Sequence, residues 1–563
     1  MDFKTEIAKS LSKILGKTIG EETIEVPPNT DLGDYAFPCF SLAKELKKSP
    51  IAIAQELAGK IKPDSYISSA KATGPYVNFF VKKESLSEKV LKDVFEKKKR
   101  YGANDKKSCV MIESPGPNTN KPLHLGHVRN IVLGNSLVEI FKFLGHKTLR
   151  VDIINDRGVH ICKSMLAYKL YGHGKQPDKK SDHYVGDFYV KYAIESEKHP
   201  EFEQEIQQML VKWEEGDKET RELWKKMSDW ALSGFKVTYD RYGVKMDKPY
   251  YESDHYLKGK DIALEGLKKG LFEKDEKGNV CIDFTDKGLG KKILLRADGT
   301  SIYITQDMAL AEIRDRDYHM DKMIYVVGNE QIHHFKVLFE IFKLLKFKFA
   351  DDCFHLAYGM VNLPEGKMKS REGKVVDADD LADEMHKTAA EELRKRYPDL
   401  GEKELEKRAE QIGMGAIKFF ILKFDPMGDF TFNPKESISF EGETGPYVQY
   451  THARCASILR KHGKSPKEHI DYSKLVADEE KNLMLLLNQF PEIVEKAAEN
   501  YKPSLVTRYL LDLCQAFNEY YHRHQIVQDD KTLEEARVLL VACVKQVLEN
   551  GLGVLGIEAP DVM

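Results

Sequence analysis

The sequence lacks the features of a membrane-spanning, disulfide-rich or zinc-ribbon protein. Its eight cysteines are far apart and form no CxxC pair, which argues against a zinc ribbon and against a disulfide scaffold. No apolar run approaches the ~20 residues that are needed to span a bilayer. The N-terminal segment is not a signal peptide, because Asp2 and Lys4 are interspersed with Phe3, Ile7 and Leu11 at the spacing of an amphipathic helix. We therefore expect a cytoplasmic protein with no membrane partner and no tightly bound metal.

A surplus of charge of either sign is also missing. The formal net charge is −3 and the pI is near 6.7, so only a local basic cluster would favour nucleic-acid binding. The composition, 42% hydrophobic and 31% charged, is that of an ordinary globular protein. A chain of 563 residues is too long for one core, and its length suggests roughly three to five domains.

Changes in residue pattern divide the chain into four parts. We expect an α+β N-terminal unit at 1–100, an α/β unit at 101–375, a helical region at 376–445 and an all-α bundle at 446–563. The first unit contains the strand-like segment 76–81. The α/β unit carries an insertion at about 165–290, which holds all three tryptophans as packing anchors of a small helical core.

The α/β unit begins with a predicted strand–helix–strand segment at 109–154. Strands at 109–112 and 148–154 flank a Pro/Gly/Asn loop and an apolar helix that Gly145 closes. Parallel strands need such a crossover, so we expect a Rossmann-like, doubly wound parallel sheet. Further strands are expected at 323–327 and 355–363, with a helix at 336–345 between them.

Helical patterns fill the C-terminal part. A long helix is expected at 379–396, and the chain from about 446 onward predicts a helical bundle. Thr532–Glu535 has the pattern of a capping box that opens the last helix, and Gly551 is the expected stop. Between Pro446 and Lys467 there are five basic residues and no acidic ones, beside two tyrosines. This cluster suits RNA phosphate contact and base stacking, although a solvated helix gives the same pattern.

The sharpest local signal is His124-Leu-Gly-His127, which follows a strand and opens a helix. Free backbone amides and the helix dipole favour phosphate at such a place. Gly126 leaves room for a nucleotide base, and the two histidines are suited to donate hydrogen bonds to phosphate oxygens as charge builds. The alternative is a pair of surface histidines at a helix cap.

A second signal is the basic segment Lys367-Met-Lys-Ser-Arg-Glu-Gly373, which follows the strand expected at 355–363. Both signals would then lie at the carboxyl ends of parallel strands, where such sheets bind ligands. Lysines on a flexible loop suit a pyrophosphate that must be held in the transition state and then released. Taken alone, a lysine-rich loop is usually only solvated.

Together the two motifs resemble the HIGH and KMSKS signatures of class I aminoacyl-tRNA synthetases. The wider context resembles the arginyl-tRNA synthetase family over nearly the whole chain. The segments that carry this resemblance are 33–35, 74–78, 114–129, 154–158, 303–307, 327–334, 444–461 and the C-terminal ending 555–563.

The resemblance implies ATP-dependent ligation of L-arginine to its tRNA through an arginyl-adenylate, with Mg²⁺ accompanying ATP. It implies these site residues. Those expected at the catalytic site are His124, His127, Lys121, Lys367 and Lys369. Those expected to contact ATP are Pro117, Gly126, His124, His127, Met368 and Ser370. Those expected around arginine are Glu113, Asn118, Tyr303, Asp307 and Gln331. Those expected to contact tRNA are Tyr447, Tyr450, Arg454, Arg460 and Lys461. The family also implies a monomer, an N-terminal domain at the corner of the tRNA and an anticodon-binding domain at 446–563.

Arginine recognition has a clear physical requirement. A guanidinium stays charged and is planar, so it calls for carboxylate partners and a flat contact. Asp307 and Glu113 are the expected charge partners, and Tyr303 orients the substrate. Asn118 and Gln331 would hold its α-amino or carboxylate end. A structural carboxylate is the alternative for Glu113, and a helix N-cap is the alternative for Asp307.

One departure from the family pattern leaves an alternative open. Ser370 stands where KMSK-type loops carry their second lysine. Either Lys121, just before the first signature, or Lys369, shifted by one position, would then meet the phosphates.

Other classes fit less well. A cysteinyl enzyme would need zinc-ligand cysteines, and a lysyl or glutamyl enzyme is not expected to carry Tyr303, Asp307 and Gln331. A simpler HxGH nucleotidyltransferase would not need the helical C-terminal domain. A non-catalytic RNA-binding protein would not need the two histidines.

Overall fold

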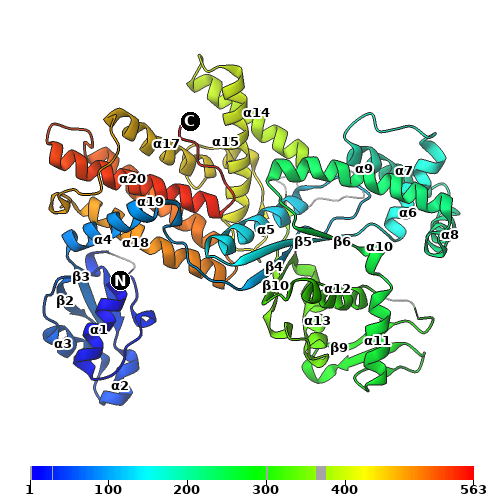
Figure 1. The fold of residues 1–563 in the computed structure, drawn as a ribbon, viewed down its shortest axis with the longest axis horizontal. Helices are drawn as coiled ribbons and strands as arrows, with labels where there is room; N and C mark the ends of the chain where they lie inside the picture. The colour runs from blue at the N-terminus through cyan, green and yellow to red at the C-terminus, as the bar shows by residue number, and fades with distance from the viewer. Residues whose placement is uncertain (1–2, 28–29, 300–301, 363–375) are drawn as a thin grey trace.

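The computed structural model describes residues 3–27, 30–299, 302–362 and 376–563. In Figure 1 the N-terminal unit lies below the C-terminal helices at one end of the molecule, and the parallel sheet lies at the centre. The segments inserted into the sheet form the opposite end.

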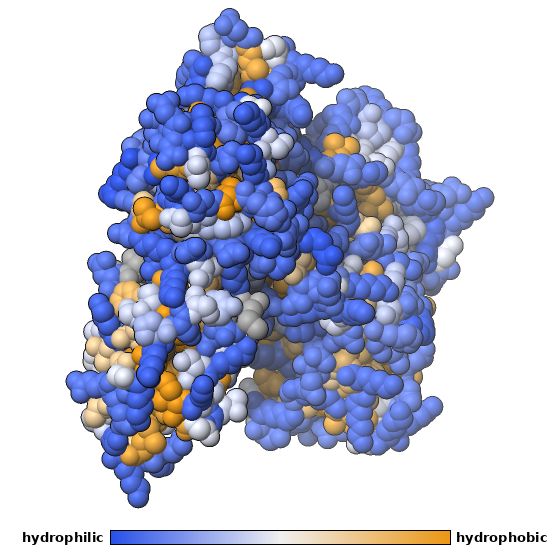
Figure 2. All heavy atoms as spheres, turned by 60° about the vertical axis from the view of Figure 1, so that its left-hand side comes forward, coloured by the Kyte–Doolittle hydropathy of each residue, from blue (hydrophilic) through white to orange (hydrophobic). Residues whose placement is uncertain are grey.

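The N-terminal unit is a small antiparallel sheet, in the order β1-β3-β2, packed with helices. Its elements are α1 (Phe3–Leu15), β1 (Tyr35–Pro38), α2 (Phe40–Leu46), α3 (Pro50–Lys60), β2 (Ile67–Thr73), β3 (Tyr76–Val81) and α4 (Lys83–Lys97). Helix α1 buries Phe3, Ile7 and Leu11, as its pattern predicts, and the expected strand 76–81 is β3. Apolar side chains gather on the surface of this unit (Figure 2), where Phe40 and Ile51 are more than half exposed.

Five strands form the central sheet in the order β11-β10-β4-β5-β6, and every neighbouring pair is parallel. Its first unit is β4 (Cys109–Glu113), α5 (Leu125–Phe143) and β5 (Lys147–Ile154). This confirms the predicted strand–helix–strand segment. Gly145 lies between α5 and β5 at φ +85, where a Cβ would clash with the main chain at Asn104. Helix α5 is buried on most of its surface because the sheet covers one side and C-terminal helices cover the other.

Two inserted segments separate β5 from β10. The first is helical: α6 (Val159–Tyr171), α7 (Ser181–Ser196), α8 (Phe202–Glu215) and α9 (Lys218–Tyr242). Trp213 is buried there, and Trp224 and Trp230 are partly buried, which agrees with their predicted packing role. The chain then returns to the sheet as β6 (Lys248–Tyr251). The expected insertion at 165–290 therefore contains a strand of the central sheet.

The second segment adds a small antiparallel sheet. Its elements are α10 (Glu252–His255), α11 (Lys258–Lys268), β7 (Glu273–Lys274), β8 (Val280–Phe284), β9 (Gly290–Leu295) and α12 (Tyr303–Tyr318). The sheet order is β7-β8-β9. Helix α12 leads directly into β10 and carries residues 303–307 on its first turn.

The second half of the sheet consists of β10 (Lys322–Gly328), α13 (Ile332–Leu344) and β11 (Cys353–Tyr358). The strand expected at 355–363 is interrupted at Gly359 and Met360. After the break, β12 (Val361–Asn362) pairs with β13 (Phe430–Thr431) instead of continuing in the central sheet.

The C-terminal part, from Ala378 onward, is mainly helical, as predicted. Its helices are α14 (Ala378–Arg396), α15 (Glu402–Leu422), α16 (Pro434–Ser437), α17 (Gly445–His462), α18 (Asp478–Glu499), α19 (Ser504–Arg523) and α20 (Lys531–Val554). The predicted ends of α20 are wrong. Asp530 caps it by accepting the amides of Thr532 and Leu533, and the helix continues through Gly551, which packs closely against Leu510. In the described residues, no helix is both long and apolar enough to cross a membrane.

Candidate active site

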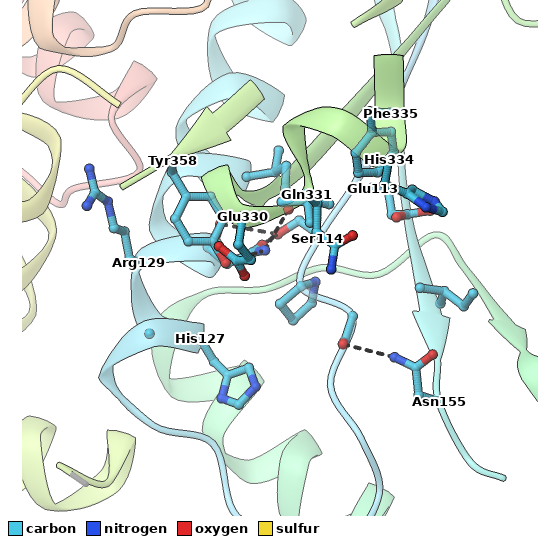
Figure 3. A pocket seen from close by; sticks show the side chains of 18 of the residues that line it. Glu113, Ser114, His127, Arg129, Asn155, Glu330, Gln331, His334, Phe335 and Tyr358 are labelled. Atoms are coloured by element: carbon cyan, nitrogen blue, oxygen red, sulfur yellow. Dashed lines mark hydrogen bonds between the residues drawn. The ribbon is translucent and has the colours of Figure 1, made fainter. Parts of the chain in front are cut away.

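A cavity of about 620 Å³ opens at the carboxyl ends of the parallel strands. Glu113 reaches it from β4, Ile153 from β5, Gly328 from β10 and Tyr358 from β11. The volume suits a small ligand, and the position is the one where doubly wound sheets bind ligands. Figure 3 shows Glu330 and Gln331, from the turn that joins β10 to α13, across the cavity from His127.

The two signature histidines lie side by side on this cavity, with ring centroids 3.9 Å apart. Nδ1 of His127 accepts the main-chain N–H of His124 at 3.1 Å, and Nδ1 of His124 accepts that of Gly126 at 3.2 Å. A neutral ring that accepts at Nδ1 carries its proton on Nε2. Each ring therefore caps α5 with one nitrogen and keeps an N–H donor on the other.

Burial keeps both rings neutral near pH 7. Burial, with the nearby Lys121 ammonium, lowers the pKa of His124 to about 4. Burial, His124 and Lys121 hold the pKa of His127 well below its ordinary value. Lys121 itself is half-buried, and burial lowers its pKa. Lys121 does not line the cavity, but its charge acts on both rings.

The remaining predicted ATP contacts divide into two groups. Gly126 lines the cavity, whereas Pro117 does not. The Pro117 carbonyl accepts the main-chain N–H of Asn155 at 3.3 Å. Lys367, Met368, Lys369 and Ser370 lie outside the described residues.

The described residues on both sides of 363–375 lie against the first signature. The N–H of Leu125 donates to the Val376 carbonyl at 2.9 Å, and that of Ala378 donates to the Leu123 carbonyl at 3.0 Å. On the other side, Met360 and Val361 line the same cavity as His124. The sheet thus brings together segments that are about 240 positions apart.

Four of the five residues expected around arginine line the cavity: Glu113, Tyr303, Asp307 and Gln331. Tyr303 is 73% exposed at the start of α12, and Asp307 follows one turn later. The Asp307 carboxylate accepts from Nε2 of His334 at 2.6 Å. The fifth residue, Asn118, is exposed and does not line the cavity.

Glu113 already has a positively charged partner inside the protein. Its carboxylate forms an ion pair with Arg314 of α12, whose side chain is 1% exposed. Burial raises the pKa of Glu113, while Arg314 acts in the opposite direction. The geometry therefore favours a structural carboxylate, the alternative noted from the sequence.

The sequence did not indicate two further polar groups near Asp307, namely Glu252 and His334. Glu252 lies in a small recess that shares Ile153 and Gln306 with the main cavity. Burial, together with the charges of Asp156 and Asp307, raises its pKa to about 7 against the opposing effect of Arg157. No motif marked Glu252. His334, in contrast, ends a recognised segment and could have been selected.

The predicted RNA cluster is partly engaged within the bundle. Arg454 lies over the rings of Tyr450 and Tyr521, 4.9 Å and 5.2 Å from their centroids, and contacts Asn518. Tyr447 accepts a hydrogen bond from Asn518 at 2.9 Å. Two further members, Arg460 and Lys461, are exposed. Tyr521 is 39% exposed and was not selected from the sequence.

A parallel sheet with an HxGH helix start at the carboxyl ends of its strands, joined to a helical C-terminal domain, defines a class I aminoacyl-tRNA synthetase. Comparisons with known proteins agree. The family model "tRNA synthetases class I (R), catalytic domain" matches residues 90–434, "Arginyl tRNA synthetase N terminal domain" matches 1–81, and "DALR anticodon binding domain" matches 448–563.

Known relatives match over the full chain. The arginine–tRNA ligase of Treponema denticola is 47% identical, over 99% of this chain and 96% of that protein. That of Bacteroides thetaiotaomicron is 42% identical, over 99% and 98%. The solved arginyl-tRNA synthetase of Thermus thermophilus superposes with a TM-score of 0.86 at 28% identity, covering 100% of both chains. The chain therefore belongs to the arginyl-tRNA synthetase family, and it is an arginine–tRNA ligase.

Proposed function

We propose that the cavity binds ATP and arginine side by side and joins them as arginyl-adenylate, which then charges tRNA. The arginine carboxylate attacks the α-phosphorus of ATP, and pyrophosphate leaves. The 2′-hydroxyl of the terminal adenosine then attacks the carbonyl carbon, and AMP leaves. One observation carries this proposal: the rings of His124 and His127 share a cavity with Tyr303, Asp307 and Gln331.

The phosphate end of the cavity lies at the N-terminus of α5. His124 and His127 each present an Nε2–H donor there, next to the Lys121 ammonium. Fixed donors of this kind stabilise charge that builds in the transition state. Lys367 and Lys369 would add positive charge. Met368, Ser370, Gly126 and Pro117 complete the proposed ATP set. Mg²⁺ enters with ATP as part of the substrate, because it prefers phosphate oxygens to a dedicated protein cage.

The arginine end lies between α12 and the β10–α13 turn. Asp307 is the proposed guanidinium partner, because its carboxylate lines the cavity and is 28% exposed. Tyr303 and Gln331 orient the substrate. Glu113 and Asn118 are assigned supporting roles. Glu113 is paired with Arg314, and Asn118 lies two residues after Gly116, which lines the cavity.

The remaining domains bind tRNA in this proposal. The bundle at 446–563 contacts the anticodon through Tyr447, Tyr450, Arg454, Arg460 and Lys461. The Tyr450–Arg454–Tyr521 stack offers aromatic and guanidinium planes of the kind that bind unstacked bases. The N-terminal unit at 1–100 contacts the corner of the tRNA, and the helices at 376–445 contact its stem. The enzyme acts as a monomer in the cytoplasm.

Aminoacylation with each of the twenty amino acids and total tRNA tests the proposal. Arginine alone should be attached in quantity, in an ATP-dependent reaction. Equal charging with lysine would contradict the assigned guanidinium site. A chain that binds RNA without consuming ATP would contradict the enzyme assignment.

A further inference from the structure

We propose that Arg129 is a positioning residue for ATP, because its guanidinium fastens one wall of the cavity, residues 358–361, to helix α5. This inference rests on the proposed function, which places ATP next to the first turn of α5. Arg129 lies on that helix only two residues after His127. The wall that it holds lines the same cavity as His124, Gly126 and His127.

The guanidinium of Arg129 joins two main-chain turns. One terminal nitrogen donates to the carbonyls of Gly359 at 2.6 Å and Met360 at 3.2 Å. The other donates to the carbonyls of Pro426 and Gly428, each at 2.8 Å. Only a planar fork with several donors reaches two separate turns at once. This contact also explains why the strand expected at 355–363 breaks at Gly359.

The charge of Arg129 has no carboxylate partner among the described residues. The side chain is 1% exposed, and the ring of Phe430 lies 4.8 Å from its guanidinium carbon. Burial lowers the pKa of Arg129 to about 10, so the group stays charged at neutral pH. A buried charge is retained only where hydrogen bonds compensate its lost hydration. Here these bonds go to the backbone of the wall, so the position of the wall depends on them.

An exposed aspartate holds the same wall from outside. The Asp429 carboxylate accepts the N–H of Met360 at 2.6 Å, and Gly359 donates its N–H to the Pro426 carbonyl at 2.9 Å. A Cβ on Gly359 would clash with the Asp429 side chain. Arg129 from inside and Asp429 from outside thus fix the turn at Gly359 and Met360.

Two variants test the inference. Arg129→Lys keeps a positive charge but loses the planar guanidinium. Asp429→Ala removes the acceptor of the Met360 N–H at an exposed position. We expect each to raise the Kd of ATP, measured by calorimetry, and the KM of ATP about tenfold, because a wall displaced by about 1 Å costs up to ~10²-fold. The KM of arginine should change less than about twofold, a split that general destabilisation does not produce.

Matched controls separate position from stability. Arg537→Lys alters a half-buried arginine that pairs with the buried Glu480 in the bundle. Asp275→Ala alters an aspartate that accepts the main-chain amides of Lys277 and Asn279 in a distant turn. Both controls should leave the Kd and the KM of ATP unchanged.

If the Kd and the KM of ATP are unchanged in Asp429→Ala, and in Arg129→Lys if it folds, the inference is overturned. Equal increases for ATP and arginine would do so as well. Failure of arginine charging would contradict the proposed function. The Kd of ATP, which calorimetry measures without turnover, still tests the role of Arg129.

Discussion

Replacement of His127 gives the most direct test of the phosphate end of the cavity. The ring performs two tasks: Nδ1 accepts the His124 amide at 3.1 Å, and Nε2 is assigned as a donor to phosphate oxygen. His127→Ala removes both. His127→Asn offers an acceptor for the amide but no donor at the Nε2 position. Comparison of the two variants therefore separates the capping task from the catalytic task.

The expected magnitude follows from the charge state of the ring. Because the pKa of His127 lies well below its ordinary value, a neutral N–H is lost at pH 7, not a cation. Loss of one fixed donor to a developing oxyanion slows a reaction by ~10²–10³. Because the lost donor is neutral, we expect the loss of rate to lie near the lower end of this range. Adenylate formation should therefore be about a hundredfold slower in both variants. Loss of the cap adds ~0.5–2 kcal/mol of destabilisation, and only in His127→Ala.

Single-turnover adenylate formation by rapid quench, with saturating ATP, arginine and tRNA, measures the effect. Thermal unfolding of the same samples measures the cap. If His127→Asn forms adenylate at the wild-type rate, the ring is only a helix cap and leaves the catalytic set. If both variants are slow while His127→Asn melts like the wild type, the donor assignment stands.

Three other predictions follow from the same geometry. Asp307→Asn should raise the KM of arginine about ten- to a hundredfold in aminoacylation kinetics, because a hydrogen bond to a charged group contributes ~1.5–3 kcal/mol, and an unchanged KM of arginine would refute the assignment. Arg314→Met should sharply lower the unfolding temperature, since an unpaired buried Glu113 costs ~3–5 kcal/mol, and the double variant with Glu113→Gln should recover most of the loss; if it does not, the ion pair is not the cause. The folded-state pKa of His124, about 4, lies below its unfolded value, so the unfolded chain binds more protons between about pH 4 and 6.5 and stability should rise with pH across that window. Urea titrations at pH 5 and pH 7 should show a smaller difference for His124→Asn than for the wild type, and an equal difference would contradict this prediction.

Local pattern was sufficient for most of the fold. Apolar segments bounded by turn residues predicted β4, α5 and β5 close to their observed bounds. Val110 and Ile112 of β4 pack in one core and Met111 packs in another, so this strand is buried on both faces. Local pattern failed where a segment makes its contacts with residues far away in sequence. The strand expected at 355–363 breaks because Arg129 and Asp429 hold Gly359 and Met360, and β12 then pairs with β13.

The same limit applies to helix ends and to the insertion. Thr532 matched a capping box, but Asp530, two residues earlier, has a carboxylate that accepts two amides. The strand β6 is only four residues long, and its pairing with β5 sets its identity. Neither fact follows from spacing alone, because each depends on which competing contact forms in the folded chain.

For the site, four of the five residues that the sequence predicted around arginine line one cavity, but the sequence did not predict which charges have partners inside the protein. Motif position placed His124, Tyr303 and Asp307 on one cavity. Sequence spacing does not reveal that Arg314 and His334 are partners of these carboxylates. Arg314, for example, lies about 200 positions from Glu113. Burial of both groups then decides that the pair is structural.

These internal partners bear on how the cavity selects a guanidinium. Among the carboxylates near its arginine end, Glu113 is paired with Arg314, and Glu252 lies 3.6 Å from Arg157. Among the described residues, the ion-pair partner of Asp307 is the imidazole of His334, and an imidazole is a weaker partner than a guanidinium. In the proposed function, the substrate guanidinium takes the place of the His334 imidazole at Asp307, whereas displacing Arg314 or Arg157 would exchange one guanidinium for another. In the proposed function, Asp307 is the carboxylate that selects the guanidinium, so Asp307→Asn should weaken arginine binding while ATP binding is retained.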